Sequence, residues 1–524
     1  MGGWRTTHPG ESPHRTTIRV SPRHPSASAA AVFLLVIGIV PATASARTVV
    51  GASALAQIDS PHPYPAGDSS NPVVWSRTLS HPGATFLKLH IARLGLGRDD
   101  TLAMLDGRGR VIAEVTTSQA GHDFWLPAVP GDQTTVVLRA SGFGGGYGLT
   151  IDRYGYGVAS IAIQSTCGTD LKEDVACYAG TSVETASRAV GRLLFEERGV
   201  FFACTGFLIS PRDHVLTNEH CISSQAAVDS LEVAFDLQAA TCGGSGPDFT
   251  PVFLGDRLLL SSVPLDFALI SLRGQPSGQH GFLRLSGRDL MADEPSYLPQ
   301  HSGGDTKKVS VRGCQVVTPA LDGRGSGTDF GHVCDTEPGS SGSPVLDLQD
   351  HVVGLHRLGG CTPSGGQNQA VRMSRILEVL PVDTTLLLTR AHIQYAPDDR
   401  DRILVRGVLR LAMAGDGIDP LSESITLTLA DAEGIFYSAT IPPRAARSVG
   451  RAFQFSDPDG RLANGLRSLR LKATGFNQFA VFASARGLAL TAARETITIT
   501  LTVGTEAASS PALFRRLPHG LVYP

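Results

Sequence analysis

A serine lies inside a short glycine-rich run, Gly339-Ser340-Ser341-Gly342-Ser343-Pro344. A serine hydroxyl attacks a carbonyl only when a base removes its proton and backbone N–H groups stabilise the oxyanion that forms. The glycines permit a tight bend and a close approach to substrate, and Pro344 leads into an apolar strand. An ordinary surface turn has the same composition, so the interpretation depends on partner residues elsewhere in the chain.

Two other segments supply such partners. His220 follows the apolar stretch 201–209, and Asp266 stands at the start of the apolar stretch 267–272. The chain order His, Asp, Ser is one of the known orders of a catalytic triad. Taken singly, His220 is typical of a surface histidine and Asp266 of a turn residue before a strand. Together with Ser341 they predict a nucleophile, its base and an orienting carboxylate.

These three segments resemble those of the chymotrypsin-like serine proteases. The resemblance narrows to bacterial lysyl endopeptidases at Cys167-Gly168-Thr169-Asp170, Val175-Ala176-Cys177 and Arg188-Ala189-Val190-Gly191. It implies a double β-barrel, and acyl transfer from a protein or peptide substrate through an acyl-enzyme. In that mechanism Ser341 attacks the carbonyl, His220 moves the proton and Asp266 orients the imidazole. The backbone N–H groups of Gly339 and Ser341 would form the oxyanion hole.

The resemblance also implies which residues surround the substrate side chain before the cleaved bond. Thr336 and His356 match pocket positions of bacterial glutamyl endopeptidases, where the histidine helps to receive a carboxylate. Asn368 stands where lysyl endopeptidases have an aspartate. Because an asparagine offers no charge to a buried lysine, we expect a pocket that prefers a polar or acidic residue. The alternative is that Asn368 is a loop residue and Glu337 serves the pocket.

Ser340 bears on activation. Trypsin-like zymogens mature when a new N-terminal amine pairs with an aspartate directly before the catalytic serine, and here that residue is Ser340. We therefore expect activity that does not need a free amine at a fixed N-terminus.

The chain has eight cysteines, all between Cys167 and Cys361. An even number beside an export signal predicts disulfides, and no C-x-x-C spacing indicates a metal site. The resemblance to lysyl endopeptidases implies the pairs Cys167–Cys361 and Cys177–Cys242. Chymotrypsin-like proteases in general imply Cys204–Cys221, which leaves Cys314–Cys334 as a fourth pair outside the lysyl endopeptidase set.

The composition predicts an all-β protein rich in turns. The 524 residues include 58 Gly and 32 Pro, and long helical patterns are few. Within the protease-like region we expect seven strands, around 190–195, 201–209, 215–217, 231–235, 268–272, 309–311 and 352–356. The regions on either side also read as strands, so we expect a chymotrypsin-like double barrel flanked by two β-sandwiches. The expected divisions are a signal peptide (1–46), a linker (47–70), an N-terminal accessory sandwich (71–157), the protease domain (160–383) and a C-terminal sandwich (385–507).

The charge and the N-terminal segment limit the partners and the compartment. With 45 basic and 48 acidic side chains, the chain lacks the positive field that a nucleic-acid partner would need. The segment 1–46 combines arginines, the apolar core 29–40 and the cleavage pattern Ala44-Ser45-Ala46, typical of an export signal. Its apolar part is too short to span a bilayer. We expect a secreted, monomeric enzyme without a membrane span.

Some alternatives stay open. A catalytically silent binding protein and an esterase with the same triad are the two rival functions, although a G-x-S-x-G elbow is missing. No cofactor is expected. Structural calcium is conceivable at two acidic clusters, where ordinary turn chemistry is the favoured interpretation: Asp398, Asp399 and Asp401, and Asp457 with Asp459.

Overall fold

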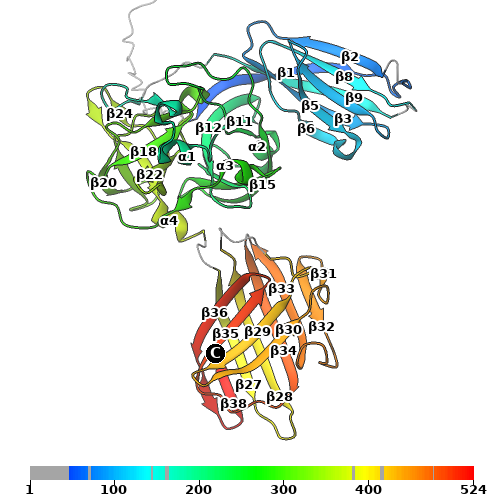
Figure 1. Cartoon of the computed structure of the whole chain (residues 1–524), viewed down its shortest axis with the longest axis vertical. Helices are drawn as coiled ribbons and strands as arrows, with labels where there is room; N and C mark the ends of the chain where they lie inside the picture. Colours follow the sequence, from blue (N-terminus) through cyan, green and yellow to red (C-terminus); the bar gives the residue numbers. More distant parts are fainter. Residues whose placement is uncertain are drawn as a thin grey trace, which may run out of the picture. The chain divides into compact units, whose positions relative to one another are not determined.

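The computed structural model describes residues 47–68, 72–142, 146–159, 165–380, 384–412, 418–475 and 477–524. The expected export signal, 1–46, lies outside the described residues. Strands make up most of the described chain, and its helices are short, so the predicted all-β class is confirmed (Figure 1). No helix in these ranges is long and apolar enough to cross a membrane. The α-helices are α1 (Ser182–Ser187), α2 (Gln225–Ser230), α3 (Pro276–His280) and α4 (Met373–Leu377).

Six antiparallel strands form the first barrel of the protease-like region, in the order β11-β14-β15-β16-β13-β12. Pairing of β11 with β12 closes the barrel. The strands are β11 (Val190–Glu197), β12 (Val200–Leu208), β13 (His214–Thr217), β14 (Glu232–Ala234), β15 (Phe253–Ser262) and β16 (Phe267–Leu272). The sequence pattern missed only β15, because register shifts around Asp256 and Leu259 interrupt its alternation.

The second barrel follows the order β10-β19-β18-β22-β23-β26-β21-β20, with β17 beside β23. Backbone hydrogen bonds from Asp293 N to Val316 O (2.8 Å) and from Val316 N to Glu294 O (2.9 Å) join β20 to the residues just before β18, which closes the strands from β18 to β20 into a barrel. The strands are β10 (Glu173–Asp174), β17 (Arg284–Leu285), β18 (Ser296–Gln300), β19 (Lys308–Ser310), β20 (Val316–Leu321), β21 (Asp329–His332), β22 (Pro344–Asp347), β23 (His351–Leu358) and β26 (Asn368–Arg372). A small hairpin pairs β24 (Cys361–Thr362) with β25 (Gly365–Gly366).

Most strands of the second barrel carry buried polar residues, and the sequence pattern missed them for that reason. Gln300 on β18, His332 on β21 and Asn368 on β26 are all fully buried. Polar residues inside a barrel break the alternation of apolar and polar positions that identifies a half-buried strand. One hydrophobic core contains residues of both barrels, such as Leu216 and Leu269 of the first and Leu355 and Val371 of the second.

The N-terminal region is a sandwich of two layers. One layer has the order β2-β8-β4-β5, and the other contains β1, β9, β3 and β6, with β7 beside β3. The strands are β1 (Thr48–Asp59), β2 (Val73–Ser80), β3 (Phe86–Gly95), β4 (Thr101–Asp106), β5 (Val111–Thr116), β6 (His122–Trp125), β7 (Val129–Pro130), β8 (Gln133–Arg139) and β9 (Gly148–Gly157). Leu89, Leu102 and Leu138 are among the residues of its core.

The stretch 47–70, expected as a linker, contains the twelve-residue strand β1. This strand is hydrogen-bonded to β9 on one edge and to β12 on the other. Its small residues gave little amphipathic signal, and its strand conformation depends on the two neighbouring edges that it joins.

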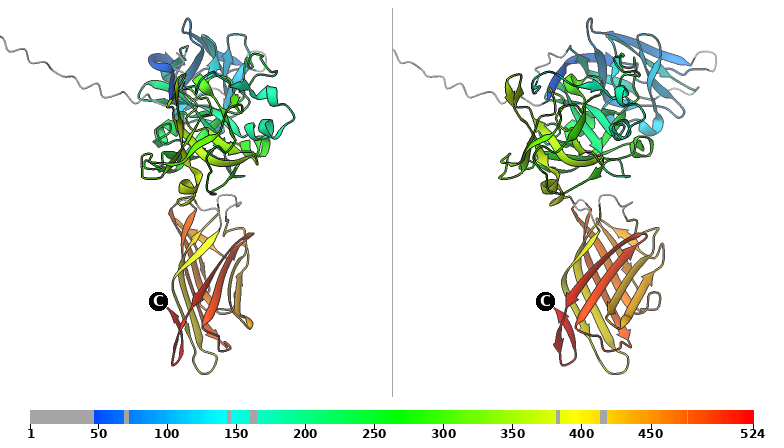
Figure 2. Two further views of the ribbon diagram at one scale, coloured as in Figure 1. Left: turned by 90° about the vertical axis from the view of Figure 1, so that its left-hand side faces the viewer. Right: turned by 60° about the vertical axis from the view of Figure 1, so that its left-hand side comes forward.

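The C-terminal region is a second sandwich, whose two layers are visible in Figure 2. Its larger sheet has the order β31-β32-β33-β34-β28-β27-β38-β37 and its smaller sheet the order β30-β29-β35-β36. The strands are β27 (Thr385–Gln394), β28 (Asp401–Arg410), β29 (Ile425–Asp431), β30 (Gly434–Ile441), β31 (Arg447–Val449), β32 (Ala452–Ser456), β33 (Leu466–Gly475), β34 (Gln478–Leu488), β35 (Thr496–Val503), β36 (Glu506–Leu513), β37 (Arg515–Leu517) and β38 (Gly520–Tyr523). The double barrel flanked by two sandwiches is thus the fold of this chain.

Candidate active site

His220 and Asp266 meet because of the pairing between β13 and β16. The two strands are antiparallel, with Thr217 opposite Ala268, so the residues after Thr217 and those before Ala268 lie at the same end. His220 Nδ1 is 2.9 Å from Asp266 Oδ2 and 3.1 Å from Oδ1, and the backbone N–H of His220 donates to Oδ1 at 3.1 Å. Asp266 is 1% exposed. The carboxylate therefore fixes both the position and the orientation of the imidazole ring.

The other imidazole nitrogen of His220 differs from Nδ1 in its surroundings. His220 Nε2 is buried and forms no hydrogen bond with the described part of the chain. A buried polar atom without a partner is uncommon and requires an explanation, and a proton-transfer role is one. Asn218 helps to hold the turn, since its Nδ2 donates to Asp266 O at 2.9 Å.

Ser341 lies where the two barrels are joined. Its carbonyl accepts from Thr205 N of β12 at 2.8 Å and lies 3.9 Å from Cys221 Sγ, beside His220. Gly342 follows with a φ of +87°, and a Cβ there would come 2.0 Å from Thr205 O. Only glycine permits this approach, which brings the Ser341 loop against β12. On the other side, Gly342 N donates to His356 O of β23 at 2.9 Å.

Arg324 is a charged neighbour of this pair that the sequence analysis missed. Its guanidinium lies 3.2 Å from Asp266 Oδ1 and 2.8 Å from Glu219 Oε2. Arg324 stands in the loop between β20 and β21, more than fifty residues from Asp266 in sequence. No local sequence motif predicts a contact between residues so far apart in the chain. The positive charge stabilises the buried carboxylate that orients His220.

Thr336 and His356 are both buried beside the Ser341 loop. Thr336 is 1% exposed, and its hydroxyl has no hydrogen-bond partner within the described ranges. His356 Nδ1 is 3.1 Å from His332 Nε2, so β21 contributes a second histidine that the sequence analysis did not single out. Burial lowers the pKa of His332 to about 3. Burial, together with the charges of His332, His220 and Arg357, holds the pKa of His356 well below its usual value. Both rings are therefore neutral at pH 7.

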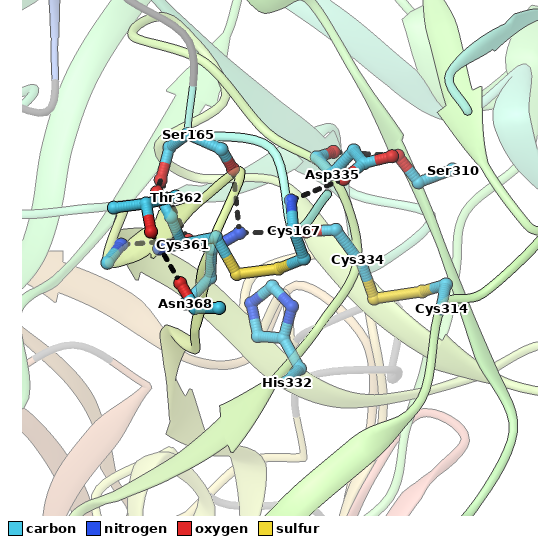
Figure 3. Close-up of a disulfide and its surroundings, with 12 residues drawn as sticks. Ser165, Cys167, Ser310, Cys314, His332, Cys334, Asp335, Cys361, Thr362 and Asn368 are labelled. Carbon is cyan, nitrogen blue, oxygen red and sulfur yellow. Dashed lines mark hydrogen bonds between the residues drawn. A yellow bond between two sulfur atoms is a disulfide. The ribbon is translucent and has the colours of Figure 1, made fainter. Parts of the chain in front are cut away.

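Asn368 is fully buried, and its amide is occupied by the backbone around it. Its Oδ1 accepts from Gly360 N (2.8 Å), Cys361 N (3.0 Å) and the Ser165 hydroxyl (2.9 Å). Its Nδ2 donates to Cys334 O (2.8 Å) and Ser165 O (3.2 Å). Figure 3 shows the side chain directed at this backbone. These contacts favour a structural role for Asn368 over a role in the pocket, although the residue begins strand β26 and is not the loop residue of the alternative.

Glu337, the other carboxylate considered for the pocket, is also engaged. It pairs with Lys172 at 3.3 Å, and its side chain is 12% exposed. Asp335 nearby accepts from Cys167 N and Leu171 N, each at 2.8 Å. Neither carboxylate is thus a ready partner for a substrate lysine.

Four disulfides lie in this region, with the pairs Cys167–Cys361, Cys177–Cys242, Cys204–Cys221 and Cys314–Cys334. Three of them are the pairs that the resemblance implied, and Cys314–Cys334 is the pair that was left over. Cys204–Cys221 ties β12 to the residue after His220, and Cys167–Cys361 is drawn beside Asn368 in Figure 3. The bonds therefore brace both the His220 turn and the surroundings of Asn368.

The acidic clusters considered for calcium are partly engaged in turns. The Asp401 carboxylate accepts from Ala396 N (2.6 Å) and Leu490 N (2.8 Å), and that of Asp457 accepts from Leu462 N at 2.8 Å. Asp398 pairs with Arg400 at 2.9 Å. Over the described ranges, no group of three His, Cys, Asp or Glu residues is arranged to hold a metal ion.

The family model of the lysyl endopeptidase C-terminal domain matches residues 167–371. The predicted resemblance to the chymotrypsin-like serine proteases is confirmed. The matched segment contains His220, Asp266 and Ser341 and all eight cysteines. The flanking sandwiches lie outside it.

Other known proteins are similar to part of the chain. Secreted RxLR effector protein 73 of Plasmopara viticola is 36% identical over 228 residues, which are 41% of this chain and 57% of that protein. Among solved structures, a Glu endopeptidase in complex with MPD is 17% identical, with a TM-score of 0.31, and covers 41% of this chain and 96% of its own. An inactive form of Rv3671c from M. tuberculosis H37Rv is 19% identical, with a TM-score of 0.28, over 39% of this chain and 92% of its own.

Proposed function

We propose that this protein is a secreted serine endopeptidase that cleaves peptide bonds through His220, Asp266 and Ser341. The observation that carries the proposal is the His220–Asp266 pair, with Nδ1 held at 2.9 Å by a buried carboxylate and Nε2 left without a partner among the described residues. The family match over 167–371 supports the reaction class. Secretion is supported by four disulfides, which persist in oxidising compartments.

In the proposed mechanism the Ser341 hydroxyl attacks the substrate carbonyl while His220 Nε2 accepts its proton. Asp266 keeps the proton of the imidazole on Nδ1 and stabilises the imidazolium that forms. The oxyanion is bound by the N–H groups of Gly339 and Ser341. The imidazolium then protonates the leaving amine, and water hydrolyses the acyl-enzyme by the same steps in reverse order.

The proposal includes a preference at the substrate residue before the cut, for a polar or acidic side chain. Support comes from the unpartnered Thr336 hydroxyl and the paired imidazoles of His332 and His356, which can donate to carboxylate or amide oxygens. A lysine ammonium would need a carboxylate, but Glu337 is paired with Lys172 and Asn368 is bound to backbone. A buried cation without a partner costs several kcal/mol.

The test compares the wild-type protein with Ser341→Ala and Ser343→Ala on a set of peptides that differ only in the residue before the cut. We expect hydrolysis by wild type and by the Ser343→Ala control, and none above background by Ser341→Ala. Cleavage after Glu or Gln should exceed cleavage after Lys. Unchanged hydrolysis by Ser341→Ala would exclude the proposed nucleophile, and an inert wild type would favour the silent binding protein. A strong preference for Lys would exclude the pocket assignment alone.

A further inference from the structure

The segment between Asp335 and Ser341 contains a tight turn that sets the direction of one oxyanion-hole N–H. Ser340 N donates to Glu337 O at 2.9 Å, which closes a four-residue turn over Pro338 and Gly339. Gly339 has a φ of +99°. Proline at the second position and a positive φ at the third are the signature of a type II turn. In a type I turn the central peptide is rotated by about 180°.

The orientation of the Pro338–Gly339 peptide decides whether the oxyanion hole exists. Pro338 O accepts from Gly303 N at 2.8 Å. Because the C=O and N–H of a trans peptide point in opposite directions, the N–H of Gly339 faces away from Gly303. The flipped peptide would direct a carbonyl oxygen, instead of an N–H donor, toward a developing oxyanion. An interaction that holds this turn in place therefore supports catalysis.

Gln300, at the end of β18, is hydrogen-bonded to both ends of the segment. Its Oε1 accepts from the Ser340 hydroxyl, and its Nε2 donates to Asp335 O at 2.8 Å. The same Nε2 donates to Ser310 Oγ at 2.9 Å, and Ser310 Oγ donates to Asp335 O at 2.7 Å. Ser340 Oγ also accepts from Glu337 N at 3.1 Å, the first residue of the turn.

This network is buried, uncharged and complete. Gln300, Ser340 and Ser310 are each at most 1% exposed. Both amide protons and the amide oxygen of Gln300 have partners, so a wrong orientation of the loop would strand several polar groups in the interior. Each stranded group costs about 1–3 kcal/mol. Fully satisfied buried networks select one conformation for this reason.

We propose that Gln300 is a positioning residue. Through the Ser340 hydroxyl it holds the loop between Asp335 and Ser341 in the type II turn that directs the Gly339 N–H toward the oxyanion. A neutral network built from the barrel interior then does what an N-terminal amine does in trypsin-like zymogens, and the loop is assembled without cleavage at a defined N-terminus. This inference rests on the proposed function, because it concerns the same Ser341 chemistry.

Three variants of the full chain test the inference. In Gln300→Leu no amide remains, and we expect kcat to fall by about 10²–10³-fold, as for loss of one oxyanion donor, with KM changed less than threefold. In Gln300→Glu the protonated acid can accept from Ser340 and donate to Asp335 O, whereas the ionised carboxylate would face that carbonyl. We therefore expect Gln300→Glu to be active at lower pH, with a new loss of kcat on the alkaline side that wild type lacks.

The matched control is Ser230→Ala, which deletes a buried hydroxyl of α2 that is bonded to Ala227 O and Glu196 N. It should leave kcat and KM unchanged. An active wild type with kcat of Gln300→Leu within threefold, or with a loss confined to KM, overturns the inference. If Gln300→Leu does not fold, a Gln300→Glu pH profile identical to that of wild type overturns it. A wild type that neither hydrolyses peptides nor reacts with a fluorophosphonate overturns the proposed function itself.

Discussion

The two sides of the Ser341 loop satisfy their polar groups in different ways. On the side of the first barrel, His220 is bonded to a carboxylate that an arginine also contacts, and one ring nitrogen has no described partner. On the side of the second barrel, Asn368 makes all its hydrogen bonds to the chain itself. Among the described residues on that side, the buried side-chain atoms without a hydrogen-bond partner are Thr336 Oγ1, His332 Nδ1, His301 Nε2 and Ser343 Oγ.

Under the proposed function, this difference separates residues that are available to a substrate from residues that hold the scaffold. A polar group that is fully bonded in the unliganded protein has little left for a ligand, and freeing it costs the bonds that it makes. Asn368 is in this position, whereas His220 is not. The residue type alone suggested a functional role for both.

Of the variants below, Asp266→Asn, on the side of the first barrel, should have the largest effect on activity. An amide at this position no longer holds the imidazole proton on Nδ1, so His220 cannot accept the Ser341 proton. We expect kcat to fall by about 10⁴-fold with little change in folding. Hydrolysis rates measured beside circular dichroism spectra check this, and a loss of less than tenfold would speak against the triad.

Asn368→Asp tests whether Asn368, on the side of the second barrel, holds the scaffold or faces the substrate. The carboxylate cannot donate to Cys334 O and Ser165 O, so two carbonyls lose their donor. We expect a destabilisation of about 1–3 kcal/mol and no gain in cleavage after lysine. Chemical denaturation and the peptide set described above measure both quantities. A new lysine preference at unchanged stability would mean that Asn368 does face the substrate.

His332→Gln tests the neutral histidines of the second barrel through pH. The pKa of His332 is lowered from 6.5 to about 3 by burial. Between these two values the unfolded chain binds a proton that the folded chain does not, so stability falls as the pH falls from about 6.5. The contribution is about 1.4 kcal/mol per pH unit.

The glutamine amide can still form a hydrogen bond with His356, but it does not titrate in this pH range. The slope of stability against pH between 6 and 4 should therefore be smaller in His332→Gln than in wild type. Urea-dependent hydrogen exchange of peptides from β21 and β23 reports it locally. Equal slopes in the two proteins would contradict a neutral, buried His332.

Arg324→Gln should have the smallest effect. The guanidinium is about one-third exposed, so its ion pair with Asp266 is weakened by solvent. We expect kcat/KM to fall by no more than about fivefold. The peptide set described above measures this ratio in Arg324→Gln beside wild type. A loss above tenfold would contradict an ion pair that solvent weakens.

The sequence predicted the parts of the site that local pattern can carry. His220, Asp266 and Ser341 stand next to apolar strands, and three of the four cysteine pairs followed from the resemblance. Strands of the first barrel alternate or are uniformly apolar, and most were found. The sequence did not predict the roles of Gln300, Arg324 and His332, because these roles arise from contacts with residues 40, 58 and 24 positions away. The strands β18, β21 and β26 were not predicted either, because their buried polar residues interrupt the hydrophobic alternation on which the prediction depends.

The central claim is that Ser341 is an activated nucleophile. Its most direct test is reaction of the intact protein with a fluorophosphonate, followed by mass spectrometry of the peptide that contains residues 335–344. We predict one adduct, on Ser341, that is absent from Ser341→Ala and greatly slowed in Asp266→Asn. No adduct on the folded protein, or an adduct on Ser340 or Ser343 instead, would contradict the account.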